Sequence, residues 1–177
     1  MQMRISSVLL ACSFILILFS PSSGHELKTR YTTITYNSEE HLRKFNKEIS
    51  LGSLSYILRN KKSFTIDDEI RDKIDVIVER VEAILEMFPK EVKFSISLLP
   101  AEEEVQGIYK KKYGKHVDFI AFYSPRDKVI FVSVKGIDLG ILAHEIAHAI
   151  IDLYYGVTTP SKIHEVLAQY VESHLKD

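Results

Sequence analysis

The chain has 177 residues, of which 46% are hydrophobic and 27% are charged. This is the composition of one soluble globular domain, and it excludes a disordered tail and a bundle of membrane helices. The 23 Lys and Arg residues are balanced by 24 Asp and Glu residues, which argues against nucleic acid as the partner, because binding to phosphates draws on clustered positive charge.

Residues 1–24 are predicted to be a secretory signal peptide. Arg4 supplies a positive charge, residues 5–19 carry no charge, and small residues precede the expected cleavage site before His25. The uncharged stretch is shorter than the about 20 residues that span a bilayer, so we expect cleavage and not a retained anchor. The single cysteine, Cys12, lies in this segment, so the mature chain can form no internal disulfide. We expect an exported protein, periplasmic or extracellular, with no stable membrane span after the signal is removed.

Residues 25–65 are predicted to form an N-terminal extension of strand and helix. The alternation of Thr with larger residues indicates a short strand at 31–36. Ser38, followed by two glutamates, is typical of a helix N-cap and predicts a helix to about Ile49. Residues 51–63 have no clear periodicity and are expected to be a short element in a loop.

The longest periodic segment is residues 66–88. Thr65 and Asp68 have the spacing of a capping box, which predicts the start of a helix. Hydrophobic residues then recur at helical spacing, and Pro89 is expected to end the helix. They are Ile70, Ile74, Ile77, Val78, Val81, Ile84, Leu85 and Phe88. Such a stripe could bind a partner, but packing in the core is its expected role.

Three strands and one helix are predicted in the next part of the chain. In residues 92–98 apolar residues alternate with Lys and Ser, which predicts a strand with one solvent-exposed face. The polar residues 102–113 are expected to form a helix closed by a glycine. Residues 117–123 and 129–134 are both strand-like. The Ser-Pro-Arg-Asp sequence between them has Pro at the second position of a turn, so we expect a hairpin.

Asp138-Leu-Gly140 is expected to lead into a helix over residues 141–151, which carries a His-Glu-x-x-His motif. His144 and His148 are four residues apart, which places both imidazoles on one side of the helix, where two nitrogens can reach one Zn²⁺ ion. Glu145 lies about 100° round the helix from His144, close enough to reach a water on the metal without binding the metal itself. Apolar residues are expected to bury the opposite side. They are Leu142, Ile146, Ala149, Ile150 and Leu153.

A second helix is expected to follow Gly156. Thr159 can cap this helix and Pro160 can take its first position, since proline is tolerated there. An apolar side is expected to pack on the rest of the protein, and Ala168 leaves room for close approach of two helices. That side comprises Ile163, Val166, Leu167, Tyr170 and Val171.

This second helix is expected to supply the third metal ligand, because a catalytic zinc site has three protein ligands and one open position. Glu165 is the favoured candidate on ligand chemistry. His164 is an alternative, but successive helix positions point about 100° apart, so the two are not expected to bind one ion together. Asp152 and Glu172 are further alternatives.

His144-Glu145-x-x-His148, followed by Glu165 on the next helix, resembles the zinc metallopeptidases of the gluzincin (thermolysin-like) class. More narrowly, the chain is similar to small exported proteins of the peptidase MA-like superfamily. The likeness covers about residues 92–177, and the hairpin before the active helix resembles the substrate-binding sheet of that family.

The resemblance implies a zincin-like α+β domain over residues 25–177, with 92–177 as its catalytic core. A small antiparallel or mixed sheet would support the active-site helix, and a C-terminal helix would carry the third zinc ligand. One Zn²⁺ ion and a peptide or protein substrate are implied, with hydrolysis by a metal-activated water.

In this hypothesis Glu145 is the general base, taking the water proton and delivering it to the leaving amine. One further donor should stabilise the developing oxyanion. The candidates are Tyr123, Tyr155 and His174. Asp152 and Gln169 each lie one turn beyond a ligand, so either could orient a ligand through a hydrogen bond.

Two other functions fit the sequence less well. The first is an exported, non-catalytic domain of the same fold in which zinc is structural and Glu145 is not needed. The second is an amphipathic partner-binding domain without a metal.

Overall fold

The computed structural model describes residues 24–59, 61, 63–156 and 160–175. Within these residues the fold is α+β, with one mixed sheet, as the sequence predicts. No helix in this part of the chain combines the length and the hydrophobicity needed to cross a bilayer. Apart from Gly24, the predicted signal peptide lies outside the described residues.

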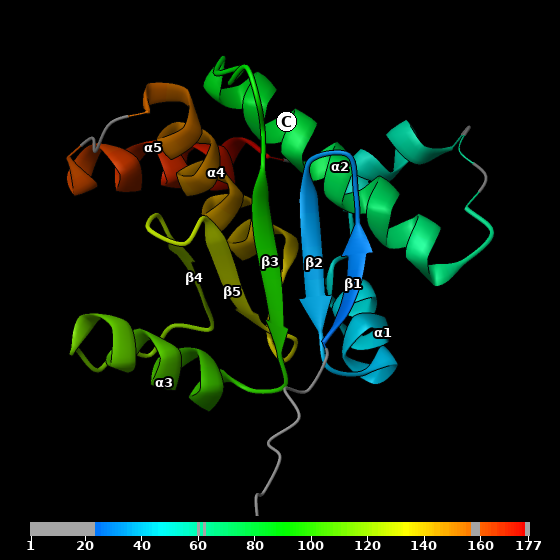
Figure 1. Cartoon of the computed structure of the whole chain (residues 1–177). Coiled ribbons are helices and arrows are strands. Elements are labelled where there is room, and N and C mark those ends of the chain that lie inside the picture. The colour runs from blue at the N-terminus through cyan, green and yellow to red at the C-terminus, as the bar shows by residue number, and fades with distance from the viewer. Residues whose placement is uncertain (1–23, 60, 62, 157–159, 176–177) are drawn as a thin grey trace, which may run out of the picture.

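The five strands have the spatial order β1-β2-β3-β5-β4 (Figure 1). The strands are β1 (His25–Lys28), β2 (Thr32–Tyr36), β3 (Phe94–Leu99), β4 (Ala121–Ser124) and β5 (Val129–Ser133). The helices are α1 (Glu39–Glu48), the 3-10 helix η1 (Gly52–Leu58), α2 (Ile66–Leu85), α3 (Glu102–Tyr113), α4 (Leu139–Tyr155) and α5 (Ser161–His174). β2, β3 and β5 are parallel neighbours, whereas β1 and β4 pair antiparallel at the two edges.

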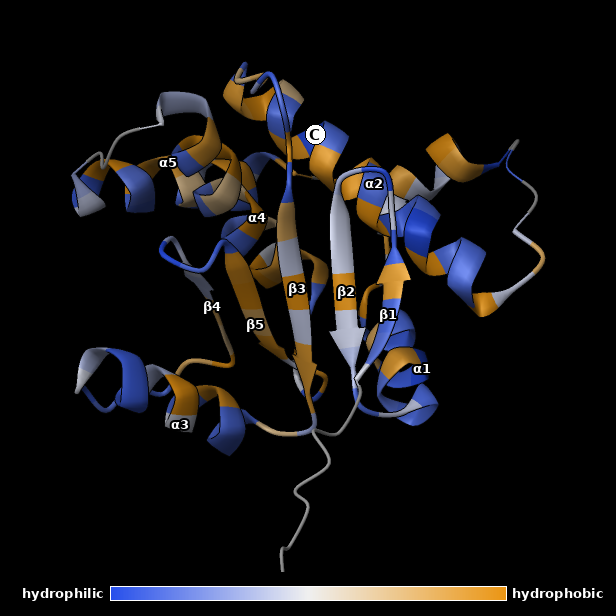
Figure 2. Cartoon of the chain, in the orientation of Figure 1, coloured by the Kyte–Doolittle hydropathy of each residue, from blue (hydrophilic) through white to orange (hydrophobic). Residues whose placement is uncertain are grey.

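Different helices cover the two faces of the sheet. On one face Ile34, Ile96 and Ile130 are fully buried in the main core, together with side chains of α1, α2, α4 and α5. On the other face Phe122 is buried with Val105 of α3 in a smaller cluster. This division follows from the alternation of side chains along each strand, which Figure 2 shows as alternating hydrophobic and less hydrophobic residues along β3.

The N-terminal part agrees with the sequence prediction in most elements. β2 and α1 are present, and Ser38 Oγ accepts a hydrogen bond from the His41 amide at 3.3 Å, as expected of a cap. The loop element predicted within residues 51–63 is η1. β1 was not predicted, because its alternation is short and three of its four residues are exposed at a sheet edge.

α2 begins as predicted and ends three residues early. Thr65 Oγ1 accepts from the Asp68 amide at 3.1 Å, and Asp68 Oδ2 accepts from the Thr65 amide at 3.2 Å, which completes the capping box. The helix ends at Leu85 and not at Phe88, because Glu86 takes a left-handed conformation with φ of 54°. The prediction that Pro89 ends it was therefore wrong; the turn at Glu86 comes first, and it buries Met87.

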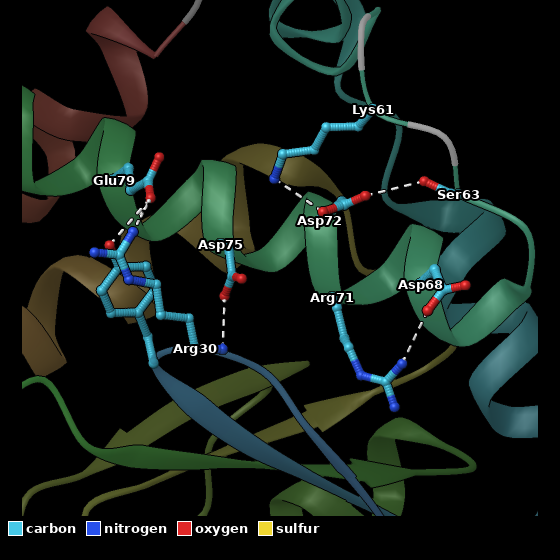
Figure 3. Close-up of polar contacts among 9 residues, drawn as sticks. Arg30, Lys61, Ser63, Asp68, Arg71, Asp72, Asp75 and Glu79 are labelled. Atoms are coloured by element: carbon cyan, nitrogen blue, oxygen red, sulfur yellow. Dashed lines mark hydrogen bonds and ion pairs between the residues drawn. The ribbon is translucent and has the colours of Figure 1, made fainter.

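The outer face of α2 carries charged residues that contact the loops around it (Figure 3). Arg30 Nη1 lies 3.1 Å from Glu79 Oε1, and the Arg30 amide donates to Asp75 Oδ1 at 3.2 Å. Lys61 Nζ lies 2.9 Å from Asp72 Oδ1. Exposed pairs of this kind each contribute at most about 1 kcal/mol, so the core face, and not this one, holds α2 in place.

The elements between α2 and α4 match their predictions closely. α3 has the predicted bounds, and the glycine that closes it, Gly114, has φ of 70°. The predicted hairpin is β4 and β5, with the Asp127 amide donating to the Ser124 carbonyl in the turn at 3.2 Å. β4 begins at Ala121, later than residue 117 as predicted.

Candidate metal centre

α4 is anchored at both ends and along its apolar side. Asp138 Oδ1 accepts from the Ile141 amide at 2.9 Å at the first turn, and Gly156 ends the helix with φ of 63°. The predicted buried side is confirmed: Leu142, Ile146, Ala149 and Ile150 are fully buried, and Leu153 packs against the same core. The other side of α4 carries His144 and His148, whose side chains are 18% and 14% exposed, and the buried side holds them in a fixed position.

α5 differs from its prediction in its start and in its packing side. Pro160 stands at the N-cap and Ser161 is the first helical residue, while Thr159 lies outside the described residues. The predicted packing side was wrong for three of its five residues. Ile163, Val166 and Tyr170 are 48%, 57% and 48% exposed.

The residues of α5 that are buried are Ala168 and Val171. The small Ala168 side chain allows the two helices to approach closely, so shape and not the number of apolar residues selects the contact side. With this side of α5 packed on α4, and not the predicted one, Glu165 points towards α4.

His144, His148 and Glu165 are brought together, as predicted. The two Nε2 atoms lie 3.2 Å apart. Glu165 Oε2 lies 3.6 Å from His144 Nε2, and Glu165 Oε1 lies 3.5 Å from His148 Nε2. Donors that surround a tetrahedral ion at about 2.0–2.1 Å are separated from one another by about 3.3–3.4 Å. This group could hold a metal ion.

The charge state of His148 suits it to bind a cation. Burial, together with the neighbouring His144 and His164, lowers the pKa of His148 to about 3. The imidazole is therefore neutral at physiological pH, with a lone pair available, which is the form that binds metals. Glu165 supplies the negative charge of the group from a half-exposed position.

Glu145 lies beside the donor group but outside it. Its side chain is buried, and Oε2 accepts a hydrogen bond from the Tyr123 backbone amide at 2.7 Å. Burial raises the pKa of Glu145 to about 7; the Tyr123 N–H opposes this shift and the charge of Glu165 adds to it. A carboxyl group with a pKa near neutrality can accept and return a proton at physiological pH.

Tyr123 and Asp152 form a second contact between β4 and α4. The Tyr123 hydroxyl donates to Asp152 Oδ2 at 2.9 Å, and burial, together with this carboxylate, raises the pKa of Tyr123. Asp152 is therefore bonded to Tyr123 and lies outside the group of metal-binding atoms. Tyr123 thus contacts α4 twice, through its amide at Glu145 and through its hydroxyl at Asp152.

Glu172 has a position that the sequence argument did not foresee. It was considered only as an alternative metal ligand, but its Oε2 lies 3.4 Å from Nδ1 of His144, the ring nitrogen that points away from the donor group. Metal-binding histidines usually donate their second N–H to a carboxylate. The spacing of two helical turns from Glu165 was the signal available in the sequence.

The other candidate residues lie away from the donor atoms. The His164 ring stacks on the His148 ring at a centroid distance of 5.7 Å but is not part of the donor group. Gln169 is exposed, and Tyr155 is 44% exposed beside Tyr154. The His174 ring packs on Tyr170, with a centroid distance of 4.0 Å. None of these residues lines the cleft described next.

A cleft of about 530 Å³ lies between β4, α4 and α5 and opens over the donor group. Its lining comprises Tyr109, Asp118, Phe119, Ile120, Ala121, Phe122, Tyr123, Ile141, His144, Glu145, His148, Glu165 and Glu172. The Ser133 amide donates to the Ile120 carbonyl, so residues 120, 122 and 124 pair with β5. Ala121 and Tyr123 therefore direct their backbone groups away from the sheet.

No protein-family model matches this chain. Comparisons with curated proteins and with solved structures also gave no match.

Proposed function

We propose that the chain is a zinc-dependent metallopeptidase in which Glu145 is the general base. The observation that carries this proposal is the spacing of 3.2–3.6 Å among the donor atoms of His144, His148 and Glu165. Two neutral-imidazole donors and one carboxylate suit Zn²⁺. The resemblance of the same residues to the gluzincin motif agrees with this choice of metal.

The chemistry divides between the ion and the chain. When bound, Zn²⁺ supplies Lewis acidity, which polarises a carbonyl oxygen and makes water more acidic. Glu145 accepts the proton that water loses and returns it to the leaving amine. The Tyr123 amide holds one oxygen of Glu145, which orients the carboxylate towards the cleft. The Tyr123 hydroxyl is bonded to Asp152, so its role is to position β4, and it does not stabilise the oxyanion.

The edge of β4 favours a peptide as the substrate. Ala121 and the Tyr123 carbonyl present backbone groups that no strand of the described sheet pairs. An extended peptide can add to such an edge through main-chain hydrogen bonds. A peptide bound there would cross the cleft within reach of Glu145, which the Tyr123 amide holds at the same edge.

Substitution of Glu145 by Gln tests the proposal. Gln keeps the size of the side chain but cannot accept the proton, so cleavage of an unstructured protein should fall at least about 100-fold while zinc content stays unchanged. Glu165→Ala is the matched variant, because it should lose the zinc as well as the cleavage. Equal cleavage by the wild type and Glu145→Gln would reject the peptidase proposal.

The burial of Glu145 also supports the second candidate, a structural zinc domain without turnover. In that case its bond to the Tyr123 amide serves only to hold β4 on α4. The wild type would then bind one equivalent of zinc and cleave nothing, and Glu145→Gln would change only the free energy of unfolding.

A further inference from the structure

The charge of the cleft is strongly one-sided. Four carboxylates line it, from Asp118, Glu145, Glu165 and Glu172, and no Lys or Arg is among the lining residues. A bound divalent cation would offset two of these charges and leave the cleft negative. An extended peptide that enters it is therefore favoured if it carries positive charge.

The end of the cleft at α3 has aromatic walls and one carboxylate. Tyr109 packs edge-on against Phe119 and Phe122, with centroid distances of 5.4 and 5.1 Å. Phe119 is 46% exposed, so part of its ring is open to the cleft. Asp118 is also exposed and makes no hydrogen bond or ion pair with any residue that the structure describes. A guanidinium or ammonium group can lie over an aromatic ring while it pairs with a carboxylate.

This end of the cleft is within reach of a peptide that lies along β4. Asp118 precedes Tyr123 by five residues, which span at most about 17 Å of extended chain. Glu145 lies next to Tyr123 on this edge, because the Tyr123 amide donates a hydrogen bond to the Glu145 carboxylate. A side chain within about five residues of the reacting peptide bond can therefore reach Asp118.

Resting on the proposed function, we propose that Asp118, Phe119 and Tyr109 form a subsite for a Lys or Arg side chain of an extended peptide substrate. The edge of β4 would fix the peptide backbone, and this subsite would select the positively charged residue. The substrate class is then a cationic, unfolded segment of a protein.

Binding to the zinc-loaded full chain carrying Glu145→Gln tests the subsite without consuming the peptide. The probes are fluorescent ten-residue peptides built from uncharged residues, with one variable position that holds Arg, Gln or Glu. The variable position is moved along the peptide, so that each position is tested in turn. In at least one position the Arg peptide should bind about five times more tightly than the Gln peptide, and the Glu peptide should bind more weakly than both.

Adding Asp118→Asn should reduce the preference for Arg over Gln to about twofold or less, and Phe119→Ala should reduce it in part. Glu103→Gln is the matched control, since this exposed carboxylate lies on α3 outside the cleft. Equal binding of the Arg and Gln peptides at every position would overturn the subsite. An equal loss with Glu103→Gln and Asp118→Asn would overturn it too, because the preference would then come from the net charge of the protein.

Cleavage by the wild type separates this proposal from the peptidase proposal. Cleavage of the Arg and Gln peptides at the same rate would support the peptidase and reject the subsite. Selective binding of the Arg peptide without cleavage by the wild type would support the subsite as a binding site and reject the peptidase.

Discussion

α4 and α5 together supply the three side chains that could hold a metal ion, yet they are held in very different ways. α4 is capped by Asp138, closed by Gly156 and buried along Leu142, Ile146 and Ile150. α5 has no side-chain cap and buries mainly Ala168 and Val171. Two of the three donors are therefore fixed by the core, while the third depends on a helix with few buried side chains.

This difference indicates how the site can form. The histidines on α4 are positioned when the core folds, whether or not a metal is bound. Glu165 reaches them only when α5 lies against α4, and a bound ion would hold it there. Metal binding and the docking of α5 should therefore be coupled.

The largest expected effect compares a buried apolar residue of α4 with an exposed apolar residue of α5. Ile146→Ala removes a fully buried side chain and should lower the free energy of unfolding by about 2–5 kcal/mol. Val166→Ala changes an exposed residue of α5 and should shift it by no more than about 0.5 kcal/mol. Urea unfolding of the metal-free variants measures both, and similar losses would contradict the contrast between the helices.

Removal of the metal should affect α5 before α4. Zinc at 100 times its Kd should stabilise the protein by about 2.7 kcal/mol, and a chelator should remove that gain. Hydrogen exchange should then accelerate in α5 while the amides of α4 stay protected. Equal acceleration in both helices would show that the metal holds the whole domain and not α5 in particular.

Glu172→Gln tests the contact between α5 and the far nitrogen of His144. A neutral amide supports the ligand less well than a carboxylate, so zinc affinity should fall about 10- to 100-fold. Gln169→Ala is the control on the same helix, because Gln169 is exposed and the affinity should not change. A larger loss of zinc affinity with Gln169→Ala than with Glu172→Gln would indicate that Gln169, and not Glu172, orients a metal ligand. Competition with a chromogenic chelator gives both affinities.

Asp138→Ala should have a smaller effect, of about 1 kcal/mol in the free energy of unfolding, because it removes the side-chain cap of α4. The core still holds the helix, so zinc affinity should stay within a factor of two or so of the wild type. A large fall in zinc affinity would mean that the histidines depend on the cap and not on the buried side.

The smallest effect concerns α2, which packs against both helices. Burial raises the pKa of Glu82 above 4.5, with the charge of Glu79 adding and Arg30 opposing. The folded protein therefore holds this proton more tightly than the unfolded chain, and stability falls as the pH rises from 4.5 through the raised pKa. Glu82→Gln should raise Tm by a few degrees at pH 7 and by less at pH 4, as differential scanning calorimetry would show.

The sequence predicts the elements that depend on local signals. The cap at Ser38, the capping box at Thr65 and the glycine after α3 each have a local physical cause, and all three are confirmed. The donor group could also be predicted, because the spacing of His144 and His148 fixes their common side on one helix.

The remaining differences depend on contacts between distant parts of the chain. The packing side of α5 is set by how closely Ala168 lets α5 approach α4, which periodicity does not report. The role of Glu172 depends on the contact of α5 with His144 of α4, and β1 is defined as a strand only by its pairing with β2.

Tyr123 gives Glu145 its hydrogen bond through a main-chain amide and not through a side chain. Every amino acid except proline offers that amide, so the bond itself requires only that the main chain of β4 is held in place, which the Tyr123 hydroxyl does by bonding Asp152. A change of this buried side chain would therefore act on Glu145 indirectly, through the position of β4 against α4.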